Sequence, residues 1–113
     1  MYLKFLFLDE HNTSGVSQVF YCEDEDSMAI QVRAVGEEKL CLTVEGRIDI
    51  DGDFHSLGIC DLEDMQIIHT ITKSGLYKVP LDGIMQIKVV NRGREGNCKV
   101  FGVMTGAPAN SRL

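Results

Sequence analysis

Two groups of carboxylates are the residues whose type and spacing best fit metal binding. Asp49, Asp51 and Asp53 alternate with Ile50 and Gly52, and residues 23–26 are four consecutive acidic side chains. Ca²⁺ takes about six to eight oxygen ligands, so either segment could supply some of them. The first segment lacks the later glycine and glutamate of an EF-hand loop, and phenylalanine and cysteine stand there instead. Asp49, Asp51 and Asp53 remain weak candidates for metal ligands, and the alternative interpretation is a polar β-turn without a metal. We expect no cofactor.

Cysteine and histidine side chains are the other groups with possible chemistry. The cysteines stand at positions 22, 41, 60 and 98, so no two form the Cys-x-x-Cys pair of zinc or thioredoxin-like sites. His11, His55 and His69 are far apart, and His69 lies in an alternating apolar pattern that favours a packed core histidine. A catalytic cysteine–histidine pair would have to be assembled by the fold. We therefore assign no catalytic residue, expect no enzymatic activity, and expect buried free thiols.

The charge balance disfavours two classes of partner. Lysine and arginine number 11 against 17 aspartate and glutamate, which gives a net charge of −6. Binding to nucleic acid or to an anionic membrane needs clustered cations, and the basic residues here are scattered. No apolar stretch approaches the roughly 20 residues of a membrane span, or the h-region of about 7–15 residues in a signal peptide. We expect no nucleic acid, no membrane, and synthesis in the cytoplasm.

Alternating apolar and polar residues indicate strands throughout the chain. Valine, isoleucine and threonine number 24 against 4 alanines, a bias that favours strands over helices. The alternation is clearest in residues 28–34, 40–45, 85–89 and 98–101. Further candidates are residues 2–8, 16–22, 54–59, 65–72 and 76–81, whereas residues 61–65 favour one helical turn.

Turn signals separate these segments at regular intervals. The pairs Asp51-Gly52 and Asp82-Gly83 are typical of hairpin turns, because both turn residues must tolerate positive φ. About eight or nine short strands with such turns predict an all-β fold, an antiparallel β-sandwich of jelly-roll type. We expect one domain over residues 1–106 and a flexible C-terminal tail over residues 107–113.

The order of motifs in residues 40–106 resembles a known group of proteins. A strand ends in Glu45-Gly46, a hairpin with Asp51-Gly52 follows, and then come the segments Gly75-Leu76-Tyr77-Lys78-Val79, Asp82-Gly83, Gln86-Ile87-Lys88-Val89 and Val100-Phe101-Gly102-Val103. This order resembles the small β-sandwich proteins encoded among bacteriophage and prophage virion genes. The first 39 residues carry no part of the resemblance.

The resemblance implies a virion structural or accessory protein associated with a head, tail or fibre. Such a protein works through self-assembly and protein–protein docking rather than catalysis. Its partners would be copies of itself, as a homo-oligomer, and other virion proteins, and its final location would be the virion. A rigid sandwich with exposed faces and edges suits that role.

Residues 2–8 and 16–22 have large apolar side chains on both faces of the predicted strand. An exposed strand could not leave both faces in water. The interface candidates in them are Leu3, Phe5, Phe7, Val19 and Phe20. The segment 2–8 is predicted to lie centrally in a sheet or beneath another subunit.

The alternative function is a small ligand-binding module for carbohydrate or calcium. The absence of tryptophan disfavours sugar stacking, and the carboxylate loops are then the candidate calcium sites.

Overall fold

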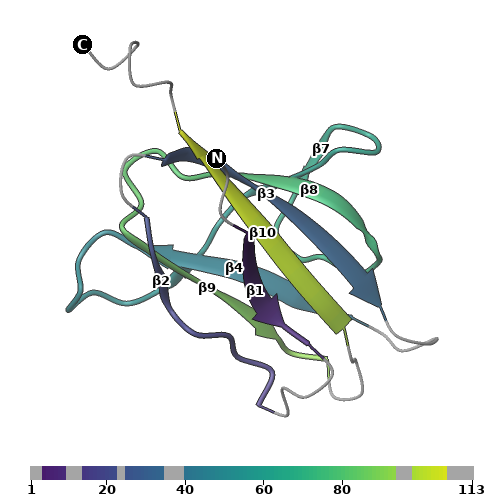
Figure 1. Ribbon diagram of the computed structural model, residues 1–113, viewed down its shortest axis with the longest axis horizontal. Coiled ribbons are helices and arrows are strands. Elements are labelled where there is room, and N and C mark those ends of the chain that lie inside the picture. The colour runs from purple at the N-terminus through teal and green to yellow at the C-terminus, as the bar shows by residue number, and fades with distance from the viewer. Residues whose placement is uncertain (1–3, 10–13, 23–24, 35–39, 94–97, 107–113) are drawn as a thin grey trace.

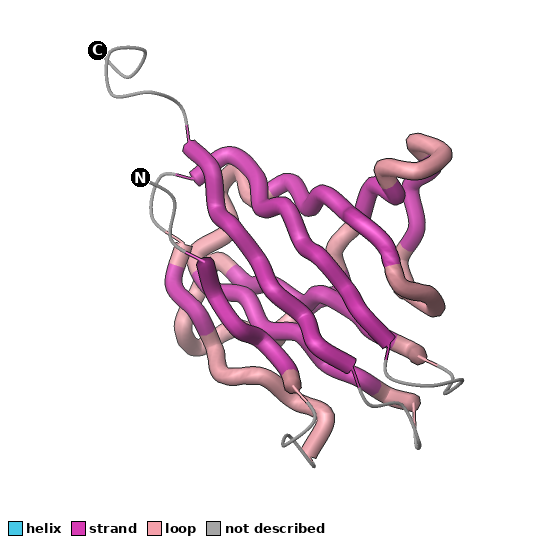
Figure 2. Tube along the Cα trace, turned by 45° about the vertical axis from the view of Figure 1, so that its right-hand side comes forward, coloured by secondary structure: helices cyan, strands magenta, loops and turns pink. Residues whose placement is uncertain are grey.

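The alternating segments form strands, and the strands form two layers. The computed structural model describes residues 4–9, 14–22, 25–34, 40–93 and 98–106, and this part of the chain contains no helix, hence none that could span a membrane. Figures 1 and 2 show two antiparallel sheets packed face to face. In spatial order the larger sheet contains β1 (Lys4–Leu8), β10 (Cys98–Gly106), β3 (Glu25–Ala34), β8 (Gly75–Pro80), β6 (Ile59–Asp61) and β7 (Gln66–Ile68). The smaller sheet contains β2 (Phe20–Tyr21), β9 (Gln86–Asn91), β4 (Leu42–Arg47) and β5 (His55–Ser56).

The predicted sandwich is confirmed, and its strand order is that of a jelly roll with one added hairpin. Without β6 and β7, the larger sheet reads β1-β10-β3-β8 and the smaller sheet β2-β9-β4-β5. The antiparallel pairs are nested, β1 with β10, β2 with β9, β3 with β8 and β4 with β5, as in a long hairpin that is rolled up. The β6–β7 hairpin extends the larger sheet beyond β8, so the described residues hold ten strands rather than eight or nine.

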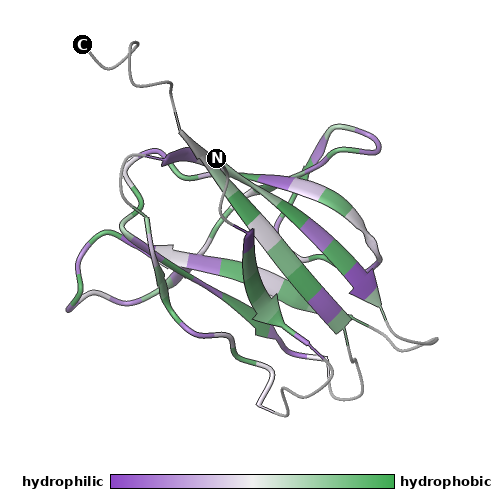
Figure 3. Cartoon of the chain, in the orientation of Figure 1, coloured by the Kyte–Doolittle hydropathy of each residue, from purple (hydrophilic) through white to green (hydrophobic). Residues whose placement is uncertain are grey.

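The side chains that point between the two sheets form the core. Met28, Ile30 and Val32 of β3 face this interior, as do Leu42 and Val44 of β4, and all five are at most 2% exposed. Figure 3 shows the corresponding alternation of polar and apolar residues along β3. Burial of such a side chain stabilises the fold by about 1.5–3 kcal/mol, so these facing rows hold the layers together.

The strand β1 differs from its prediction in an informative way. It lies at the edge of the larger sheet, not at its centre. A bulge shifts the register between Leu6, which pairs with Phe101, and Leu8, which pairs with Val100. The extra residue lets both Phe7 and Leu8 point inward, at 4% and 3% exposure. The bulge thus buries neighbouring apolar residues of both phases, whereas Leu6 stays 47% exposed on the outer side.

Two weaker predictions are only partly met. Residues 16–22 contribute the two-residue strand β2 and an isolated bridge between Val16 and Val90. Residues 61–65 form the turn of the β6–β7 hairpin, which is closed by one i→i+4 hydrogen bond, as in a single turn of helix. In this turn the Met65 N–H donates to the Asp61 carbonyl at 2.7 Å, and Met65 adopts a φ of 61°. The predicted tail, residues 107–113, lies outside the described residues.

Candidate docking surface

The three aspartates between β4 and β5 lie in an exposed loop, and Asp49 accepts hydrogen bonds from within it. Asp49 accepts the Asp51 N–H at 3.0 Å through Oδ1, and its backbone carbonyl accepts the Gly52 N–H at 2.8 Å. Asp53 is exposed at the end of the turn. Among the residues that the structure describes, no group of three His, Cys, Asp or Glu side chains is arranged to hold a metal ion. The geometry seen here is that of an Asx turn.

The four thiols are free, and two of them are buried in the sandwich. Cys22 and Cys98 are buried, Cys41 and Cys60 are half-buried, and all four are free. Burial raises the pKa of the Cys22 thiol to about 11, and the nearby Glu25 carboxylate adds to the rise. Burial also raises the pKa of Cys98. A nucleophilic cysteine needs a lowered pKa, so the environments of these two thiols work against that chemistry.

The histidines within the described residues do not form a core or catalytic cluster. His55 lies on the edge strand β5 and is exposed. His69 follows β7 in a bend and is also exposed, so the prediction of a packed core histidine is wrong. The alternation around His69 breaks because β7 ends at Ile68. His11 lies outside the described residues.

Three of the apolar interface candidates pack inside the sandwich. The ring of Phe20 meets Phe5 and Phe7 edge-on, with centroids 5.2 and 4.8 Å apart. Phe7 is buried, whereas Phe5 and Phe20 are half-buried. Val19 is 39% exposed, and Leu3 lies outside the described residues. The aromatic cluster thus joins β1 of one sheet to β2 of the other.

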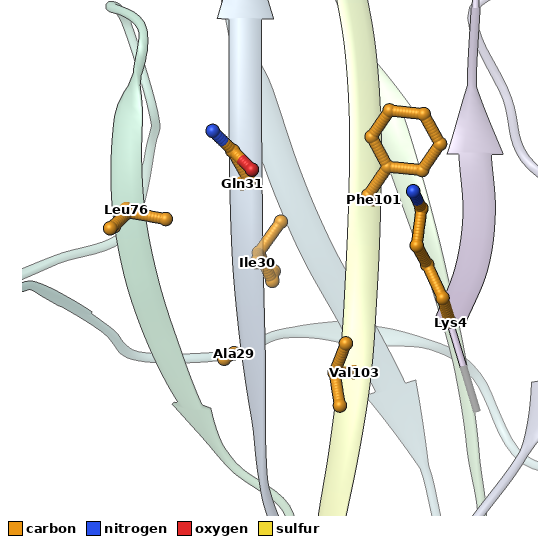
Figure 4. A pocket seen from close by; sticks show the side chains of 7 residues that line it. All are labelled: Lys4, Ala29, Ile30, Gln31, Leu76, Phe101 and Val103. Carbon is orange, nitrogen blue, oxygen red and sulfur yellow. The ribbon is translucent and has the colours of Figure 1, made fainter. Parts of the chain in front are cut away.

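The outer face of the larger sheet carries apolar side chains that sequence analysis did not select. Gln31 of β3 pairs with Leu76 on one side and with Phe101 on the other, so these three side chains point outward together. They line a groove of about 270 Å³ with Lys4, Ala29, Ile30 and Val103, which Figure 4 shows. We call it the outer-face groove.

Several apolar side chains on the outer face of the larger sheet, in the groove and beside it, are strongly exposed. Leu76 is 54% exposed, Leu6 on the neighbouring edge strand is 47% exposed, and Ile67 on β7 is 68% exposed. The Lys4 ammonium lies 4.3 Å from the centroid of the Phe101 ring, a cation–π contact. The sequence did contain one indication of this apolar outer face. Both faces of β10 carry apolar residues, Phe101 and Val103 on one face and Val100 and Met104 on the other.

The outer face of the smaller sheet is polar and largely occupied by its own contacts. Glu45, only 8% exposed, receives a hydrogen bond from Thr43 Oγ1 at 3.2 Å and from Arg92 at 3.0 Å, with Lys88 Nζ at 3.9 Å. The ring of Phe54 lies beneath the cations of Arg47 and Lys88, each 4.3 Å from its centroid. Between the two outer faces, the apolar one is therefore the better docking surface.

Comparison with known proteins gives structural matches. No protein-family model matches the sequence, and no curated protein matches it. The SPBc2 prophage-derived protein YomS has a similar structure, with a TM-score of 0.80 at 12% identity, covering 92% of each chain. The PBSX exported protein XepA matches with a TM-score of 0.76 at 13% identity over 92% of this chain and 37% of XepA. The sandwich of this chain is thus a fold shared with these two prophage-derived proteins.

Proposed function

We propose that this chain is a non-enzymatic structural or accessory protein of a phage or prophage virion. It assembles with copies of itself and docks onto other virion proteins. The observation that carries the proposal is the exposed apolar outer face of the larger sheet, where Leu6, Leu76 and Ile67 stand in solvent. Exposed large apolar side chains gathered on one face are typical of protein–protein contact sites. The fold shared with YomS and XepA supports the prophage setting.

This function requires no cofactor, nucleic acid or membrane, and it places the protein in the cytoplasm on synthesis and in the virion afterwards. The test is sedimentation velocity of the full chain from micromolar to millimolar concentration. We expect concentration-dependent association. A chain that stays strictly monomeric over this range contradicts self-assembly.

A thermal melt distinguishes this proposal from a calcium- or sugar-binding module. Ligands that bind only the folded chain raise the Tm. We expect the Tm to stay unchanged on addition of Ca²⁺ or of simple sugars. A rise with Ca²⁺ that Asp51→Asn removes would instead support a site at Asp49, Asp51 and Asp53.

A further inference from the structure

The loop between β4 and β5 exposes two isoleucines among its aspartates. Ile48 is 70% exposed and Ile50 is 63% exposed, and they alternate with the exposed Asp49 and Asp51. The loop projects at the left of Figure 1, at the end of β4. Two large aliphatic side chains in solvent on one tip form an acidic and apolar knob. We call residues 48–53 the acidic loop.

The acidic loop is held in one conformation by the smaller sheet. Besides the turn at Asp49, Arg47 donates from one guanidinium nitrogen to the Gly52 carbonyl at 3.1 Å. Its Nε donates to Gln86 Oε1 at 2.6 Å, and the guanidinium lies over the ring of Phe54. A loop that is already ordered loses little entropy when it binds, which favours its use as a docking element.

The outer-face groove has the complementary character. Its walls are mainly apolar apart from Gln31 and Lys4. Outward positions of its four strands carry the cations Lys4, Arg33, Lys78 and Lys99. On these strands, within the described residues, the exposed or half-buried carboxylates are those of Glu25 and Asp26, at the start of β3. The chain as a whole has a net charge of −6, so this cationic face departs from the average surface.

We propose that the acidic loop of one copy docks into the outer-face groove of a second copy. This inference rests on the proposed function and specifies its self-assembly contact. Ile48 and Ile50 would pack on Leu76 and Phe101, and the aspartates would face the cations around the groove. The contact is head-to-tail, and it leaves one copy with a free loop and the other with a free groove. Repeated, it closes into a ring or extends as a filament.

Complementation between two variants tests the contact. The loop variant carries Ile48→Ser and Ile50→Ser, and the groove variant carries Leu76→Ser and Lys78→Glu. All four positions are exposed, so both variants should melt like the wild type. Tyr21→Ser, at a residue 66% exposed on the other sheet, is the matched control.

We expect each variant alone to associate at least tenfold more weakly than the wild type in sedimentation velocity, and Tyr21→Ser to associate normally. A mixture of the two variants should form 1:1 dimers and nothing larger, because the pair retains one intact loop and one intact groove. This contact is overturned if either variant associates as strongly as the wild type, or if the mixture of the two variants stays monomeric. Neither outcome overturns the proposed function. A monomeric wild type overturns both.

Discussion

Burial at Cys22 links one residue to the alkaline stability of the whole chain. Its pKa is raised to about 11 from 9.0, so the folded state keeps the thiol proton to higher pH than the unfolded state does. The stabilisation is complete below about pH 9 and is lost as pH rises toward 11. We expect the stability difference between wild type and Cys22→Ala, measured by urea unfolding, to shrink between about pH 8 and pH 10.5. A difference that stays constant would contradict this role of Cys22.

The carboxylate of Glu45 is a second case in which the surroundings of one side chain affect the free energy of unfolding. It is nearly buried and forms ion pairs with Lys88 and Arg92, so Glu45→Gln removes the counter-charge of two cations. We expect a loss of about 1–2 kcal/mol in the free energy of unfolding, read from the urea midpoint. Arg92→Gln is the control, because that side chain is 62% exposed and its loss should cost less than about 1 kcal/mol. Equal effects of the two variants would be evidence against the role given to burial.

Among the strands, β10 depends on a glycine where it is covered by its neighbours. A Cβ at Gly102 would collide with the Phe7 ring and lie 3.1 Å from Met28 Sδ. Gly102→Ala should therefore cost about 1–3 kcal/mol through overpacking. At Gly58 an added Cβ would meet only Ile67 Cγ2 at 3.6 Å, so Gly58→Ala should change stability by less than about 0.5 kcal/mol. Thermal melts of both variants check the prediction.

Strands with regular alternation were predictable, and those with irregular pairing were not. Residues 28–34 predicted β3, because their period of two is also the burial pattern that the structure has. Residues 85–89 predicted β9, although burial there does not alternate: Gln86 is buried beside Ile87, and Met85 is exposed. The bulge at Phe7 escaped prediction, since it depends on pairing with β10, which lies more than ninety positions later. The added β6–β7 hairpin joins the sheet through only two residue pairs with β8, and no local pattern specifies that contact.

For the whole molecule, the two outer faces could not be assigned from sequence. Phe101 and Leu76 come together because both pair with Gln31, and this requires the strand order as well as the alternation. The acidic loop was recognised for its aspartates and interpreted as a possible metal site. Its two isoleucines, Ile48 and Ile50, are also exposed, which the alternation of residue types alone did not indicate. The interface candidates Phe5, Phe7 and Phe20 contact one another between the two sheets.

Salt dependence distinguishes docking by the acidic loop from unspecific association of apolar faces. Two copies, each of net charge −6, repel one another, so screening by salt strengthens any contact that lacks local charge complementarity. Contact between the aspartates and the cations of the groove has the opposite dependence. We expect the association constant to fall several-fold between about 0.05 and 0.5 M NaCl, where the Debye length falls from well above to well below 10 Å. Lys78→Glu should reverse or flatten that slope, whereas Tyr21→Ser should keep it. Association of the wild type that strengthens with salt would contradict the charge pairing.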